Sequence, residues 1–119
     1  MTTSPTGVKY DGGKPRMGLL PPRALDSIAE VLTFGAVKYA PDNWRKVEGA
    51  EWRYLDAAMR HITAHMRGEA NDNESGIGHL SHAACCLMFL IDTQCELDEK
   101  RQRDIGSTVF ANLTETLTS

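Results

Sequence analysis

The sequence has little of several features that mark whole classes of protein. No apolar run approaches the length of about 18 residues that a membrane-spanning helix needs, and the first residues contain no apolar core of a signal peptide. Cysteines number only three, an odd count, so we do not expect a disulfide framework. These absences predict a cytoplasmic protein with no membrane partner.

An excess of basic charge is also missing. The formal net charge is −3 at pH 7, whereas a protein that binds DNA or RNA along the phosphate backbone needs a basic surface. We therefore expect no nucleic-acid partner. A local basic loop that binds a single nucleotide is compatible with this total.

The remaining composition is that of a folded helical domain. The chain has 119 residues with 41% hydrophobic and 24% charged residues, which fits one globular domain. Apolar residues recur at steps of three and four, and strand-like alternation is lacking, so the pattern predicts an all-α bundle of three or four helices. The expected helices are 23–40, 52–67 and 77–97.

The two ends of the chain differ from this helical domain, which we place at residues 23–98. Residues 1–22 contain Gly-Gly and Pro-Pro pairs and predict an irregular N-terminal arm. Residues 99–119 begin highly charged and become rich in Ser and Thr. Apolar residues at four-residue steps there indicate a weak fourth helix that forms only against a partner subunit. They are Ile105, Val109, Leu113 and Leu117.

The apolar surface of the predicted helices exceeds what one chain can cover. Helix 77–97 is apolar all round in its middle, and helix 52–67 carries a heptad-like seam typical of helices packed side by side. We therefore expect a homo-oligomer, either a dimer or a tetramer. The seam consists of Trp52, Leu55, Met59, Ile62 and Met66.

All four histidines fall within 22 residues. His61 and His65 are spaced i,i+4 and His79 and His82 i,i+3, so each pair projects from one helix face. Imidazoles and carboxylates brought together in this way are typical of a divalent-metal site, although histidines on solvated helix flanks would give the same spacing. The carboxylates between the two pairs are those of Glu69, Asp72 and Glu74.

A second motif concerns phosphate binding. Gly12-Gly13-Lys14-Pro15-Arg16 places two cations beside flexible glycines whose backbone N–H groups can face an anion. The motif lacks the Gly-Lys-Ser/Thr of a P-loop, and a short basic turn is often only solvated. Lys38 has the same two interpretations, as an exposed charge or as a phosphate contact.

Several strings together resemble one known family. They are KYDGGKPRMGLLPP, EVLTFGAVKYAPDNW, RYLDAAMRHITAHMRGEANDNESG and GHLSHA. The chain resembles the phage dATP/dGTP diphosphohydrolase family in its N-terminal-domain form, a relative of the MazG-like all-α nucleotide pyrophosphatases. The resemblance implies metal-dependent hydrolysis of purine deoxynucleoside triphosphates to the monophosphate and pyrophosphate, in the host cytoplasm if the chain is phage-encoded.

The candidate metal ligands depart from the MazG-like pattern. Those enzymes bind Mg²⁺ with paired acidic residues on two helices. By the resemblance, the corresponding positions of the last helix are His79 and His82 in this chain. The preceding helix offers His61 with Glu69. Imidazole shifts the preference from Mg²⁺ toward Mn²⁺, Co²⁺, Ni²⁺ or Zn²⁺. Alternatively, the carboxylates of Glu69, Asp72 and Glu74 hold Mg²⁺, and the histidines either support these ligands or act as acid or base. The candidate ligands are His61, Glu69, Asp72, Glu74, His79 and His82.

The implied reaction assigns further residues. Glu69, Arg60 and His61 are the candidate catalytic residues, since charge grows on the phosphate oxygens during attack. Tyr39 or Trp44 would stack on the purine, and Asn43 offers a donor and an acceptor to its edge. The candidate phosphate contacts are Lys14, Arg16 and Lys38.

Two other classes of function compete with an enzyme. A nucleotide-sequestering protein of a phage would need the same cations and aromatic residues but no metal. A purely structural helical oligomer explains the apolar surfaces, but it leaves the histidine and acid cluster without a reason.

Overall fold

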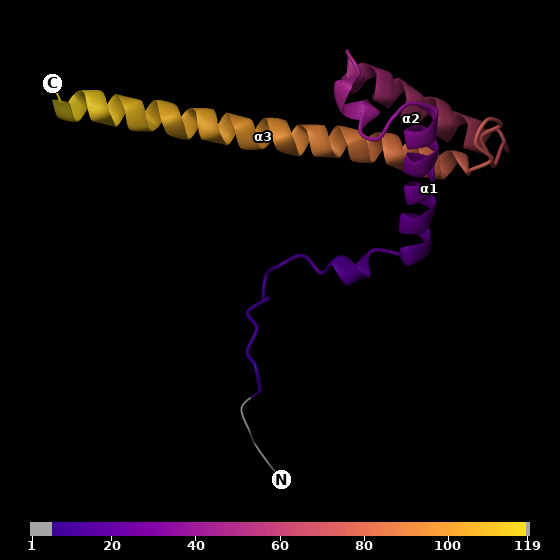
Figure 1. Cartoon of the computed structure of the whole chain (residues 1–119), viewed down its shortest axis with the longest axis horizontal. Helices are drawn as coiled ribbons and strands as arrows, with labels where there is room; N and C mark the ends of the chain where they lie inside the picture. The colour runs from indigo at the N-terminus through magenta and orange to yellow at the C-terminus, as the bar shows by residue number, and fades with distance from the viewer. Residues whose placement is uncertain (1–5, 119) are drawn as a thin grey trace, which may run out of the picture.

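The computed structural model describes residues 6–118, and in that range it is helical with no named strand. Figure 1 shows α1, α2 and the beginning of α3 meeting in a helical head, from which the N-terminal arm and the rest of α3 project. The predicted all-α fold and irregular arm are therefore confirmed, apart from residues 1–5, which lie outside the described range. The elements are η1 (Met17–Leu19), α1 (Pro22–Lys38), η2 (Asn43–Lys46), α2 (Ala50–Met66) and α3 (His79–Thr118).

The first two long helices begin and end where the sequence predicts, to within two residues. Pro22 is the first residue of α1, where its fixed φ suits a helix and its missing N–H costs nothing. Gly49 precedes α2 with φ 66°, and Gly68 follows it with φ 92°. Both glycines adopt left-handed conformations that reverse the chain at a helix end.

The third helix differs from the prediction. It runs for 40 residues without a break, so the segment expected as a separate weak helix continues α3. No proline interrupts it, and Gly106 costs only about 1 kcal/mol within a helix. The side chain of Leu117 lies outside the described residues. No described helix, α3 included, combines the length and apolar content needed to cross a membrane.

The core lies where α2 and α1 pack against the first half of α3 (Figure 1). It is built of small side chains, and no large side chain among the described residues is fully buried. Small residues let helix backbones approach closely, so groups at the edge of the contact come within bonding distance. The buried apolar residues are Val31, Ala58, Ala64, Ala83, Cys85 and Cys86.

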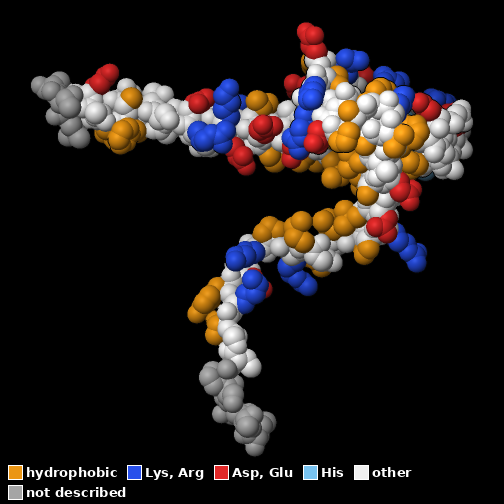
Figure 2. Space-filling model, in the orientation of Figure 1, with side chains coloured by type: hydrophobic (Ala, Val, Ile, Leu, Met, Phe, Trp, Pro, Cys, Tyr) orange, Lys and Arg blue, Asp and Glu red, His pale blue; other side chains and the backbone are white. Residues whose placement is uncertain are grey.

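Large apolar side chains remain on the surface of the single chain. The predicted seam on α2 is largely exposed, with Trp52 at 70%, Met59 at 59% and Met66 at 78%. Figure 2 shows further hydrophobic groups on the arm and near the C-terminal end of α3. These side chains are therefore largely exposed in the single chain, in contrast to the buried small residues between α2 and α3.

Candidate metal centre and adjoining cavities

Three of the four histidines meet where α2 crosses the start of α3. His61 Nδ1 on α2 lies 2.9 Å from His79 Nδ1 on α3. The ring of His82, one turn further along α3, stacks on His61 with centroids 4.6 Å apart and planes 14° from parallel. The predicted i,i+3 pair therefore does present both imidazoles to the facing helix.

The loop between α2 and α3 adds a carboxylate to this cluster. An isolated bridge between Asn71 and Gly78, together with a 2.8 Å hydrogen bond from the Asp72 backbone N–H to the Ile77 carbonyl, closes the loop. Asp72 Oδ2 accepts the backbone N–H of Ser75 at 2.9 Å, which fixes its carboxylate. One ligand atom from each of His61, Asp72 and His79 lies within 4.8 Å of the others.

The protonation states suit a divalent cation. Burial, reinforced by the neighbouring imidazoles, lowers the pKa of His61, and burial likewise lowers the pKa of His82. Burial acts to raise the pKa of Asp72, but the hydrogen bond from the Ser75 backbone and, in the acid range where Asp72 titrates, the protonated His82 imidazole outweigh it, and the pKa is lowered. Neutral imidazoles and an ionised carboxylate thus offer their lone pairs at neutral pH.

The spacing of the ligand atoms also fits a metal ion. With metal–nitrogen bonds of about 2.1 Å, neighbouring ligands at a right angle lie about 3.0 Å apart. The two Nδ1 atoms of His61 and His79 are 2.9 Å apart. The same distance allows one imidazole to donate a proton to the other, so either a proton or a cation can join these rings.

Ser75 belongs to the site, although the sequence analysis did not single it out. Its hydroxyl accepts the Ile77 backbone N–H at 3.1 Å and lies 2.7 Å from Nε2 of His82. Because the hydroxyl is fixed by the loop, it holds the His82 ring in one orientation. Its only sequence signal is its place in the turn that follows Asp72.

Other candidate ligands are not brought into the cluster. Glu69 is exposed, and its carboxylate accepts a hydrogen bond from the Arg67 guanidinium at 3.1 Å. Glu74 pairs with Lys38 at 2.6 Å, and this bond, with its charge, raises the pKa of Lys38. His65, which is not among the six candidate ligands, is exposed on α2. Of the six candidate ligands, the structure therefore groups His61, Asp72 and His79.

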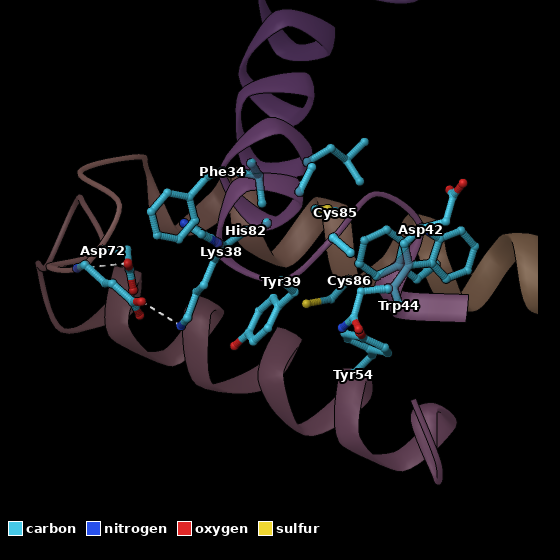
Figure 3. A pocket seen from close by; sticks show the side chains of 18 of the residues that line it. Phe34, Lys38, Tyr39, Asp42, Trp44, Tyr54, Asp72, His82, Cys85 and Cys86 are labelled. Carbon is cyan, nitrogen blue, oxygen red and sulfur yellow. Dashed lines mark hydrogen bonds and ion pairs between the residues drawn. The ribbon is translucent and has the colours of Figure 1, made fainter. Parts of the chain in front are cut away.

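A cavity of about 270 Å³ adjoins the cluster, close to the lower end of the range of about 300–1,000 Å³ usual for ligand pockets. His61, His82 and Asp72 are among its lining residues, together with further polar side chains and apolar ones such as Val31 and Phe89. Figure 3 shows Tyr39 between Lys38 and Trp44 along this cavity, with Asp72 beyond Lys38.

The predicted substrate contacts divide into two groups. Lys38, Tyr39, Asn43 and Trp44 all line the cavity. Lys14 and Arg16 do not, because both lie on the exposed arm that projects away from the helical head (Figure 1).

The aromatic residues of this cavity are not equally available for stacking. Trp44 stacks on Phe89 with centroids 4.4 Å apart, and the Arg45 guanidinium lies 4.3 Å from the centroid of the Trp44 ring. These contacts occupy the indole ring. Tyr39 is 63% exposed, so its ring is the more accessible one.

The cysteines in the cavity wall are thiols rather than thiolates. Burial raises the pKa of Cys85 to about 12 and also raises the pKa of Cys86. A metal ligand or nucleophile needs the thiolate. Cys86 is not among the residues that the structure groups with His61, Asp72 and His79, and it forms part of the cavity wall.

Arg60 points to a second cavity of about 520 Å³ on the neighbouring face of α2. Tyr39, Asn43 and Tyr54 line both cavities. The candidate catalytic residues Arg60 and His61 are thus adjacent in sequence but line different cavities.

Comparison with known proteins identifies the family. The pattern of the family described as dATP/dGTP diphosphohydrolase, N-terminal, matches residues 4–103. The chain belongs to the dATP/dGTP diphosphohydrolase N-terminal family. The match covers the arm and the whole helical head, and it ends within α3.

A relative in this family comes from Salmonella phage PMBT28 and is named dATP/dGTP diphosphohydrolase. It is 38% identical over 101 residues, which cover 81% of this chain and 33% of the relative. The chain therefore spans about a third of the length of that relative. No solved structure matches this member of the dATP/dGTP diphosphohydrolase N-terminal family.

Replacing a grouped residue should weaken metal binding much more than replacing the outlying histidine. We expect His79→Ala and Asp72→Asn each to reduce Mn²⁺ affinity by more than about tenfold, the usual loss for residues that merely support a ligand. Isothermal titration calorimetry measures this. Asn at position 72 keeps an oxygen for the loop hydrogen bond, and His65→Ala is the matched control. Equal affinities in all variants would contradict the site.

Lowered histidine pKa values also predict how stability depends on pH. The folded-state pKa of His61 and His82 lies below the ordinary 6.5, so folding releases protons and stability falls as pH drops below 6.5. We expect a lower urea midpoint at about pH 5.5 than at about pH 7.5 in EDTA. His61→Gln and His82→Gln should each reduce this difference, and an unchanged difference in both would count against the assignment.

Proposed function

We propose that the chain catalyses the metal-dependent hydrolysis of purine deoxynucleoside triphosphates, dATP or dGTP, to the monophosphate and pyrophosphate. The observation that carries the proposal is one cavity in which His61 and Asp72 of the His61–Asp72–His79 cluster lie beside apolar residues and an exposed tyrosine. Membership in the dATP/dGTP diphosphohydrolase family and the name of the phage relative support it.

In this proposal His61, Asp72 and His79 hold a divalent ion, which supplies Lewis acidity toward the phosphate oxygens. A set of two imidazoles and one carboxylate favours Mn²⁺, Co²⁺, Ni²⁺ or Zn²⁺ over Mg²⁺. His82 accepts a proton from the attacking water, because its imidazole is neutral at neutral pH and lines the cavity. Ser75 acts as a positioning residue, since its hydroxyl fixes Nε2 of His82.

The purine lies in the apolar part of the same cavity. Tyr39 is the stacking residue that the geometry favours, because the ring of Trp44 is already engaged by Phe89 and Arg45. Asn43 lines the cavity beside Tyr39, where its amide can reach the edge of a base. Water leaves an apolar pocket readily, so stacking there stabilises a bound base.

The expected setting follows from the relative. The relative belongs to a Salmonella phage, and we propose that this chain likewise acts on the nucleotide pool in the cytoplasm of an infected host. Removal of dATP or dGTP there would change the relative concentrations of DNA precursors.

Incubation with each deoxynucleoside triphosphate tests the reaction directly. With Mn²⁺, Co²⁺ or Mg²⁺ we expect dATP or dGTP to give the monophosphate and pyrophosphate, resolved by ion-exchange chromatography. EDTA should abolish turnover, and His79→Ala should lower it by orders of magnitude while His65→Ala does not. Tight binding of a nucleotide that is recovered unchanged after metal is restored would favour a sequestering protein instead.

We also propose that the protein is a homo-oligomer, a dimer or a tetramer, which covers the exposed seam on α2. Trp52, Met59 and Met66 are all more than half exposed in the single chain, and burying such side chains stabilises association by about 1.5–3 kcal/mol each.

Light scattering after size-exclusion chromatography should therefore give a mass of at least two chains. Met59→Glu should shift the protein toward the monomer, because a carboxylate in an apolar interface loses its hydration. His65→Glu, at an exposed position about 100° around α2 from the seam, tests added charge alone. A stable monomer at micromolar concentration in the parent protein would refute the oligomer.

A further inference from the structure

The second cavity has a different chemical character from the first. It lies beside α2 and is lined by two arginines, Arg53 and Arg60, together with Asp56 and the shared residues Tyr39, Asn43 and Tyr54. Its volume of about 520 Å³ is that of a small-ligand site. The reaction as described above assigns no role to this cavity.

Helix geometry places the two guanidinium groups on one face. Arg53 and Arg60 are seven residues apart, so they project in nearly the same direction, about 10 Å apart along the axis. Neither forms an ion pair with any residue that the structure describes. Arg53 donates only a long hydrogen bond of 3.4 Å to the Glu48 carbonyl. Both side chains can therefore donate to a ligand in the cavity.

The charges of the two cavities determine which one accepts a polyphosphate. The first cavity holds three carboxylates, from Asp42, Asp72 and Glu74, and one ammonium, from Lys38. That ammonium is already bound to Glu74 at 2.6 Å. The second cavity holds two guanidiniums and one carboxylate. A divalent ion at the metal cluster brings the first cavity to zero net charge, whereas the second cavity stays net positive, so a phosphate chain extending from the cluster is attracted toward the second.

The two cavities are also adjacent and share three lining residues. Tyr39, Asn43 and Tyr54 form a wall common to both. Arg60 directly precedes His61 on α2, and its charge acts on the His61 imidazole. A nucleotide whose α-phosphorus lies at His61 would therefore have its next phosphate beside Arg60 and its last one toward Arg53.

From these observations we propose that the second cavity binds the β- and γ-phosphates of the substrate, with Arg60 and Arg53 as the phosphate-binding residues. The inference rests on the proposed function, because it takes the metal cluster as the position of the α-phosphorus. Planar guanidinium groups donate paired hydrogen bonds to phosphate oxygens, which gives both affinity and orientation. The same contacts would hold pyrophosphate after cleavage.

The proposal makes a distinction between nucleotides with and without these phosphates. We would measure binding of dAMP and of the α,β-methylene analogue of dATP, which is not cleaved, to the Mn²⁺-loaded protein by calorimetry. Arg53→Ala and Arg60→Ala should each reduce the affinity for the analogue by about tenfold, which corresponds to the loss of one charge-assisted contact. Affinity for dAMP should change by less than about twofold, within the scatter usual for surface substitutions.

Matched variants separate this effect from loss of structure or of general positive charge. Arg103→Ala removes a guanidinium from an exposed position far along α3 and should change neither affinity. Arg53→Lys keeps the charge and should recover part of the affinity for the analogue. Circular dichroism melting of Arg53→Ala and Arg60→Ala should match that of the parent, since neither residue is buried.

The outcomes distinguish this inference from the proposed function. Any of three outcomes overturns the phosphate site. The affinity for the analogue is unchanged in both variants, the affinity for dAMP falls as much as that for the analogue, or the parent protein does not bind the analogue. If the variants show the predicted binding pattern but the parent protein releases no product, the phosphate site is supported and the hydrolase function is refuted. If Arg53→Ala and Arg60→Ala hydrolyse dATP with an unchanged KM, the hydrolase function is supported and the phosphate site is refuted.

Discussion

Close packing of α2 against α3 is the constraint on which the other features of this protein depend. Ala58 is 1% exposed and Ala83 3%, and side chains of this size let the two helix backbones approach closely. Only at that separation can an imidazole from α2 reach one from α3 at 2.9 Å. Larger residues at these two positions would separate the helices, and overpacking of this kind typically costs about 1–3 kcal/mol. The core and the candidate metal centre therefore share one structural cause.

Much of this arrangement could be predicted from the sequence, because it follows from local periodicity. Apolar steps of three and four residues, with Pro22 at the start of the first helix and Gly68 after the second, predicted α1 and α2 to within two residues. The spacing of His79 and His82 correctly placed both rings on one helix face. These features depend on neighbours in the chain, which a sequence displays directly.

Features that depend on distant contacts could not be predicted in the same way. Glu69 and Asp72 are both loop carboxylates, yet only Asp72 joins the cluster, because the bond between its backbone N–H and Ile77 turns the loop inward. The engagement of Trp44 by Phe89 requires knowing that residues 45 positions apart meet. The full length of α3 was missed because low local propensity in 99–119 does not by itself stop a helix that has already begun.

The ion pair between Lys38 and Glu74 has a consequence for the order of events at the first cavity. It joins the end of α1 to the loop that carries Asp72, and it neutralises the one ammonium among the lining residues. A polyanion arriving alone meets a negative field, whereas a cation meets an attractive one. Ordered loading, with the cation ahead of the nucleotide, is the kinetic sequence that this field favours.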